Sequence, residues 1–211
     1  RLPGKAGADL HGYLILATCF GRAYPLIVAQ QIQVGVRRML KVYGRNNSVN
    51  VQKVMWIIGE LGLDYERVDA GGAFGQNDQD WFLALNPMGR VPVLDDDGYI
   101  LWESHSIIRY LARQNPAAGL YPTDPQACGD VDKWLDWKLG FSQPALFGAF
   151  WGLIRTPEAE QDKEAIEASA KESAALFGIL DKHLQGRDYM AGDSFGVADI
   201  PVGAQAYRWY G

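Results

Sequence analysis

The sequence predicts an α/β domain with a mixed sheet, followed by an all-helical domain. Short strand and helix patterns alternate over residues 39–115, whereas only helical periodicity is visible over residues 126–211. The segment 116–125 between them contains three prolines and is typical of an interdomain linker. Residues 1–38 follow neither pattern and are predicted to be an N-terminal extension.

The N-terminal extension is expected to lie outside the functional fold, with Met39 as the true start. Its apolar run 12–20 is too short to span a bilayer. The extension carries five basic residues against one acidic residue, whereas the whole chain has a formal net charge of −5. The alternatives are a secretory signal, an organelle transit peptide and a structured extension.

The first domain is predicted from short runs that alternate between strand and helix patterns. Four strands are expected, at 40–43, 65–68, 91–94 and 99–102. Three helices are expected, at 51–61, 80–85 and 103–113. The helix between the first two strands makes those strands parallel, and the turn at Asp97-Gly98 closes a hairpin. This βαβαββα order is the thioredoxin-like arrangement.

The second domain is predicted to be entirely helical. One helix covers 130–141 and resumes after Pro144. A second carries an apolar stripe from Ile166 to Leu184, and a third begins near Val197. The chain therefore combines a thioredoxin-like N-terminal domain with an all-α C-terminal domain.

Val91-Pro92 and Glu103-Ser104 indicate a ligand site. A proline gives no ladder hydrogen bond, so Pro92 is expected at a strand's first residue or after a cis bond. A cis bond would leave the main-chain N–H and C=O of Val91 free to pair with an extended peptide. Glu103-Ser104 opens a helix, where free N–H groups favour a carboxylate. Together these features suit a small acidic peptide, and glutathione is the obvious candidate.

These residues resemble the glutathione-binding half of a cytosolic glutathione S-transferase of the bacterial, serine-type or theta-like sort. That family carries a Val-Pro cis-proline before its third strand and a Glu-Ser pair at its third helix. The resemblance extends to KVYGRNNSVNVQKV, GELGLDYERVD and FGVADI, and covers residues 39–211. Family members usually continue with further helices, so the resemblance implies a C-terminally truncated chain. In FGVADI, Gly196 is expected at the helix cap, with Asp199 three residues later.

The resemblance implies roles for individual residues. Ser48 follows Tyr43 by five residues, as the active serine does in the family, and would donate a hydrogen bond to the glutathione thiolate. The alternatives are Asn50 as this donor and Ser48 as a simple helix cap. The expected glutathione-binding residues are Arg90, Val91, Pro92, Glu103 and Ser104. Arg45, Gln76 and Asn77 are weaker candidates.

The resemblance implies that the glutathione thiolate attacks a hydrophobic electrophile, with the aromatic-rich helical region 134–151 as one wall. Glutathione-dependent disulfide or peroxide reduction, and a non-catalytic binding module, are the alternatives. A homodimer is expected from the resemblance alone. Glutathione is expected to act as co-substrate. No metal is expected, because the spacing of the histidines is not that of metal ligands. His105 is interpreted as a surface or interface residue.

The remaining expectations concern partners and compartment. A net charge of −5 argues against nucleic acid as the main partner. No membrane partner is expected. The cysteines Cys19 and Cys128 form no CxxC motif, which favours a reducing compartment, the cytoplasm.

Overall fold

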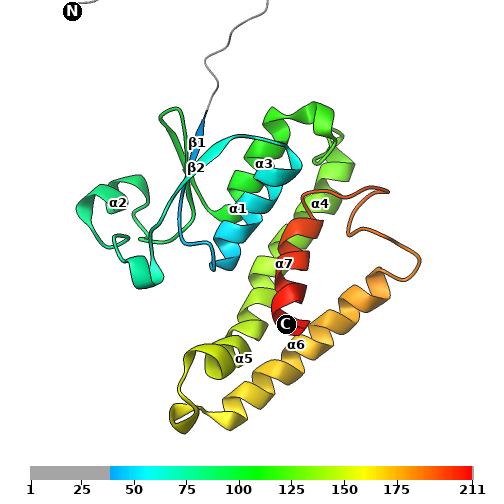
Figure 1. The fold of residues 1–211 in the computed structure, drawn as a ribbon. Helices are drawn as coiled ribbons and strands as arrows, with labels where there is room; N and C mark the ends of the chain where they lie inside the picture. The colour runs from blue at the N-terminus through cyan, green and yellow to red at the C-terminus, as the bar shows by residue number, and fades with distance from the viewer. Residues whose placement is uncertain (1–38, 211) are drawn as a thin grey trace, which may run out of the picture. The chain divides into compact units, whose positions relative to one another are not determined.

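A computed structural model describes residues 39–210, and its sheet is the mixed sheet predicted (Figure 1). The strands are β1 (Leu40–Tyr43), β2 (Tyr65–Val68), β3 (Val93–Asp96) and β4 (Tyr99–Trp102). Their order is β2-β1-β3-β4, with β1 parallel to β2 and antiparallel to β3, and β3 antiparallel to β4. The predictions for residues 1–38, including Cys19, lie outside the described residues.

The sheet carries helices on both faces. The helices of this half are α1 (Val49–Glu60), α2 (Asp80–Leu85) and α3 (Ser104–Gln114). In Figure 1, α1 and α3 lie together on one side of the strands and α2 lies on the other. The apolar residues of α1 recur at helical spacing, and Val51, Val54 and Ile57 are fully buried against the sheet and α3. A smaller cluster forms around Phe82 of α2.

Several predicted element boundaries shift by a few residues, and α1 begins at Val49 instead of Val51. Strand β3 begins at Val93 instead of Val91, because Pro92 cannot donate to the ladder. Helix α3 begins at Ser104, because Glu103 has a φ of +70° and cannot be its first helical residue. The Val91-Pro92 peptide bond is cis.

The second half is helical. It contains α4 (Pro125–Trp137), a π-helical segment (Lys138–Ser142), α5 (Gln143–Arg155), α6 (Lys163–His183) and α7 (Asp199–Tyr210). Short 3₁₀ turns lie at Gly72–Phe74, Pro116–Ala118 and Glu158–Glu160. Asp124 caps α4 by accepting hydrogen bonds from the main-chain N–H groups of Gln126 and Ala127. The expected break near Pro144 is absent, since the π-helical segment continues the chain and Pro144 lies in the first turn of α5.

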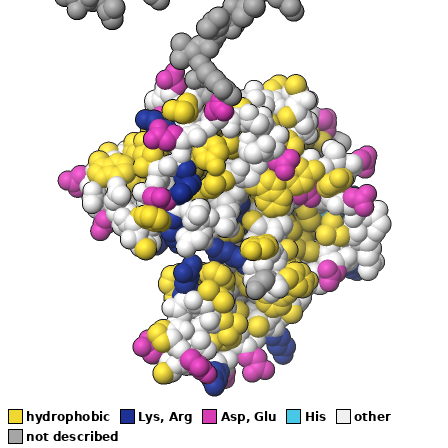
Figure 2. Space-filling view, in the orientation of Figure 1, with side chains coloured by type: hydrophobic (Ala, Val, Ile, Leu, Met, Phe, Trp, Pro, Cys, Tyr) yellow, Lys and Arg dark blue, Asp and Glu magenta, His cyan; other side chains and the backbone are white. Residues whose placement is uncertain are grey.

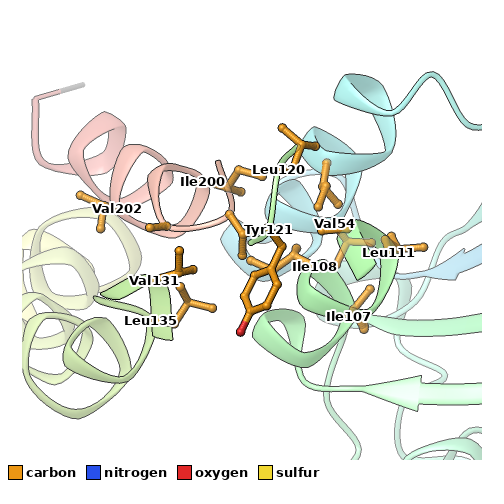
Figure 3. Close-up of a cluster of buried hydrophobic side chains, with 14 of the residues drawn as sticks. Val54, Ile107, Ile108, Leu111, Leu120, Tyr121, Val131, Leu135, Ile200 and Val202 are labelled. Carbon is orange, nitrogen blue, oxygen red and sulfur yellow. The ribbon is translucent and has the colours of Figure 1, made fainter. Parts of the chain in front are cut away.

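One buried cluster joins the two halves (Figure 3). Side chains of α1 and α3, such as Val54 and Ile108, meet Leu135 of α4 and Ile200 of α7. The main-chain N–H of Val197 also donates to the carbonyl of Leu120, at 2.9 Å. This packing fixes α7 and α4 relative to α1, and therefore relative to the loop that contains Ser48.

The turn before α7 keeps half of the expected capping arrangement. Asp199 Oδ2 accepts a hydrogen bond from the Gly196 N–H at 2.8 Å, and Oδ1 accepts one from the Met190 N–H at 2.8 Å. A glycine has no side chain to return the first bond, so Asp199 supplies the only side-chain bond of this capping pair.

Over residues 39–210, none of the helices has both the length and the apolar character that crossing a bilayer requires. The division into 39–115, 116–125 and 126–211 stays a prediction.

Candidate functional site

Ser48 occupies the N-cap position of α1, but its hydroxyl does not cap the helix. The residue is 8% exposed. Its main-chain N–H donates to the Arg45 carbonyl at 3.2 Å, which closes the loop after β1. Within residues 39–210, no partner receives or gives a hydrogen bond at the Ser48 hydroxyl. The cap alternative therefore fails, and the hydroxyl is available to a ligand.

Asn50 lies two residues after Ser48, in the first turn of α1. Its Oδ1 accepts a hydrogen bond from Lys53 Nζ at 2.9 Å. Because the amide oxygen accepts from Lys53, the amide nitrogen remains as a donor, and Asn50 lines the cavity described below. Ser48 and Asn50 both line this cavity, so the structure leaves both donors in place.

The loop before β3 is held by two asparagines. Asn77 Nδ2 donates to the Gly89 carbonyl and Asn86 Nδ2 donates to the Arg90 carbonyl, each at 2.8 Å. Gly89 has a φ of +59°, and a Cβ there would lie 2.8 Å from the Asn77 carbonyl oxygen, so no larger residue fits. These contacts position Val91. No other residue within 39–210 hydrogen-bonds to its main chain, which leaves that edge open to a peptide.

Glu103 and Ser104 lie where the sequence predicts, at the N-terminus of α3. Ser104 is buried, and its Oγ lies 3.4 Å from Lys53 Nζ. Glu103 is exposed and holds its unusual positive φ, a conformation that costs about 1–3 kcal/mol in a non-glycine residue. Such a conformation is common at ligand sites, because it turns the N–H groups and the side chain toward one side.

Lys53 connects the two parts of the site. It is fully buried in α1 and contacts Asn50, Ser104 and the Nε2 atom of His105, the last at 3.1 Å. Burial, followed by the nearby Lys138, lowers the pKa of Lys53 well below its usual value.

Lys138, in the π-helical segment, is the second buried lysine. Burial lowers its pKa to about 8, and its Nζ donates to Gln143 Oε1. Burial, followed by Lys53, lowers the pKa of His105 to about 2, so this imidazole is neutral at ordinary pH. His105 is 2% exposed, so its interpretation as a helix-surface histidine was wrong. Its place on the inner face of α3 explains the difference.

A cavity of about 190 Å³ lies beside Ser48 and Asn50. Its other lining residues come from the loop after β1, from α1 and from the helical half: Arg45, Val49, Lys138, Gln143, Leu146, Phe147, Phe150, Trp151, Arg155, Gln205 and Arg208. Figure 2 shows a hollow on this face with Lys and Arg side chains at its edge. The cavity can place an electrophile against the hydroxyl of Ser48, with α5 and α7 as the opposite wall.

The predicted residues fall into two groups. Ser48 and Asn50 line the cavity, whereas Val91, Pro92, Glu103 and Ser104 do not. The second group lies along the open edge at β3 and α3, and Lys53 bridges from Asn50 to Ser104.

The candidates for binding the glycyl carboxylate of glutathione differ in their surroundings. Arg90 is exposed and does not line the cavity, whereas Arg45 does and packs against Gly72. Asn77 is engaged within its own loop. Within residues 39–210, no group of three or more His, Cys, Asp or Glu side chains is placed to hold a metal ion.

Sequence reasoning missed Lys53 and Lys138. A signal was present for Lys53, which falls on the apolar stripe of α1 next to Val54, where a solvated lysine does not fit. No comparable signal marks Lys138, because its burial depends on the π-helical segment.

Both halves of the chain match family models. The glutathione S-transferase N-terminal domain model matches residues 38–113, and the glutathione S-transferase C-terminal domain model matches residues 142–210. Glutathione S-transferase GstB of Escherichia coli strain K12 is 44% identical over 174 residues, covering 82% of this chain and 84% of the relative. Glutathione S-transferase 3 of Zea mays is 34% identical, covering 76% and 73%.

A solved structure of the same family has a similar fold. The theta class glutathione S-transferase of Xanthomonas axonopodis pv. citri with glutathione bound superposes with a TM-score of 0.78 at 42% identity, covering 81% of this chain and 82% of that one. The fold and these relatives thus define a glutathione-dependent transferase. The chain belongs to the glutathione S-transferase family.

Proposed function

We propose that the protein conjugates the glutathione thiolate to an electrophile held in the cavity beside Ser48. The observation that carries the proposal is the buried hydroxyl of Ser48, which lines the cavity and has no partner within residues 39–210. A hydrogen bond to the sulfur favours the thiolate and lowers the thiol pKa. A pKa decrease of one unit corresponds to about 1.4 kcal/mol of preference for the ionised form.

The remaining residues of the proposed site bind the peptide. The main chain of Val91, after which Pro92 turns the backbone, would pair with the cysteinyl residue. Glu103 and Ser104 would hold the γ-glutamyl end at the N-terminus of α3, where free N–H groups favour a carboxylate. Arg90 and Arg45 are the candidates for the glycyl carboxylate, and Arg45 is favoured because it lines the cavity.

Asn50 supports a second candidate, glutathione-dependent disulfide or peroxide reduction. Asn50 lines the same cavity, and because Lys53 donates to its amide oxygen, its amide nitrogen remains as a donor. The bound sulfur would then attack a disulfide or peroxide instead of a carbon electrophile. The two activities share the glutathione site and differ in the product.

Product analysis tests the proposal on the full chain. The protein is mixed with glutathione and either a nitroaryl chloride or a small hydroxyalkyl disulfide, and the thioether and the released thiol are measured. Transferase function predicts thioether formation that falls in Ser48→Ala. Thiol release without thioether, lost in Asn50→Ala, would instead establish the reductase. Neither product would overturn both and leave a non-catalytic module.

We also propose that the protein is a homodimer, that it is cytoplasmic and that its activity requires no metal. The dimer and the location rest on the resemblance to the family and, for the location, on cysteine usage. Sedimentation equilibrium of the full chain tests the first, and activity retained after chelation tests the last.

A further inference from the structure

The cavity beside Ser48 is strongly basic. Arg45 follows β1, Arg155 ends α5 and Arg208 belongs to α7, so three separate elements each direct a guanidinium into its lining. Lys138 adds a fourth cationic group. None of the described residues that line the cavity is an aspartate or a glutamate. A cavity for a purely apolar electrophile would not need this charge.

The arginines repel one another and have no counter-charge in the described chain. Burial, followed by Arg155 and Arg45, lowers the pKa of Arg208, which places the three charges within interaction range. Within residues 39–210, none of the three forms an ion pair with a carboxylate. The Phe150 ring offsets part of the repulsion between the guanidinium groups, because the guanidinium carbons of Arg208 and Arg155 lie 4.3 Å and 6.0 Å from its centroid. An anionic ligand would relieve the remaining repulsion.

Another part of the lining is aromatic and apolar. Phe147 and Trp151 of α5 stack with ring centroids 5.4 Å apart, and Leu146 and Phe150 lie on the same helix. Phe147 and Trp151 are 58% and 51% exposed, so their faces are open to a flat ligand. The cavity thus combines a surface for a planar apolar body with a set of cations.

We propose that the electrophile is an amphipathic anion, an aromatic molecule that carries a carboxylate or sulfonate, bound by Arg155 and Arg208. This inference rests on the proposed function and names its substrate class. Arg45 is set apart because it packs against Gly72 on the glutathione side. With an aryl chloride, the thiolate sulfur forms a C–S bond at the ring, chloride leaves with its electron pair, and the thiol proton goes to solvent.

A matched substrate pair tests the inference on the full chain. 4-Chloro-3,5-dinitrobenzoate is compared with its methyl ester, and each kcat/KM is divided by the uncatalysed rate with glutathione. The corrected ratio is expected to favour the acid by about tenfold, the value of one charge-assisted hydrogen bond. Arg155→Gln and Arg208→Gln should each reduce that ratio severalfold, whereas the exposed Arg187→Gln should keep it. A ratio near one, or a ratio unchanged in both cavity variants, overturns the inference.

A binding measurement separates failure of this inference from failure of the proposed function. Calorimetry compares 4-nitrobenzoate with 4-nitrobenzamide while S-methylglutathione saturates the peptide site. Tighter binding of the anion, lost in Arg155→Gln, supports the inference even if neither electrophile is conjugated, a result that would count against the proposed function alone. Equal binding of the two probes overturns the inference. A preference for the anion that is present without S-methylglutathione and lost with it would show that the cations serve glutathione, and would also overturn the inference.

Discussion

The Nζ atom of Lys53 lies 2.9 Å from Oδ1 of Asn50, inside the interface between α1 and α3. The same nitrogen lies 3.4 Å from Ser104 Oγ, so one buried amine contacts both ends of the proposed glutathione site. Burial, followed by the nearby Lys138, lowers the pKa of Lys53, and the Glu103 carboxylate acts in the opposite direction. Lys53 is therefore a positioning residue, which orients Asn50 and Ser104 and does not itself line the cavity.

Replacement of Lys53 by methionine should separate ligand binding from stability. Lys53→Met removes the bonds to Asn50 and Ser104, so we expect the dissociation constant of glutathione to rise about tenfold. The free energy of unfolding should stay within about 1 kcal/mol of the parent or increase, because a buried amine is replaced by an apolar chain of similar volume. Calorimetry and urea unfolding measure the two quantities.

Lys171→Met is the matched control, since Lys171 is exposed on α6 and does not line the cavity. It should change neither quantity. If Lys53→Met unfolds the protein and leaves the affinity of the remaining folded molecules unchanged, Lys53 is structural only.

Ser104→Ala should weaken glutathione binding with little effect on folding. The hydroxyl is buried at the first residue of α3, where it adds a donor to the free N–H groups. We expect the dissociation constant to rise by about fivefold to thirtyfold, equivalent to about 1–2 kcal/mol. Ser106→Ala, two residues further along α3, is the control for calorimetry. Equal effects of the two substitutions would remove Ser104 from the site.

His105 should make stability depend on pH. Its folded-state pKa of about 2 lies below the ordinary value of 6.5, so the unfolded chain binds more protons between these limits. The contribution is present above about pH 6.5 and is lost as pH falls toward 2, by up to about 1.4 kcal/mol per pH unit. Urea unfolding between pH 7 and 4 should show a shallower decline for His105→Gln than for the parent. Parallel declines would show that His105 is protonated in the folded protein.

Asp199→Ala should destabilise the protein without changing the glutathione site. The substitution leaves the Gly196 and Met190 N–H groups without their acceptor. We expect a loss of about 2 kcal/mol or more in the free energy of unfolding. The exposed Asp193→Ala is the control in thermal unfolding. A loss no greater than that of the control would show that the turn before α7 does not depend on this carboxylate.

Local sequence patterns predicted most of the fold. Strands β1, β2 and β4 and helix α2 have the predicted bounds, since alternation and turn residues delimit them within a few positions. Helix α4 begins at Pro125 instead of residue 130, and other errors occur where a single residue overrides the pattern. Pro92 delays the start of β3, and the positive φ of Glu103 delays α3 by one residue.

The candidate site was less predictable, because it depends on which residues the fold buries together. Ser48 and Asn50 could be chosen from their place after the first strand. The sequence does not show that Lys53 and Lys138 are buried near each other, since 84 residues lie between them. The burial of the Lys138 side chain also depends on the π-helical segment. The aromatic wall was anticipated, whereas its association with Arg208 was not, because α5 and α7 meet only in the folded chain.

The most direct test of the account is the pKa of the glutathione thiol bound to the full chain. Ultraviolet absorbance of the thiolate is titrated for the parent, Ser48→Ala, Asn50→Ala and the exposed Ser194→Ala. The account predicts a depressed thiol pKa in the parent and the Ser194→Ala control, and a rise of about one unit in Ser48→Ala, worth about 1.4 kcal/mol. A bound thiol that titrates like free glutathione, or a pKa that rises only in Asn50→Ala, would contradict the role given to Ser48.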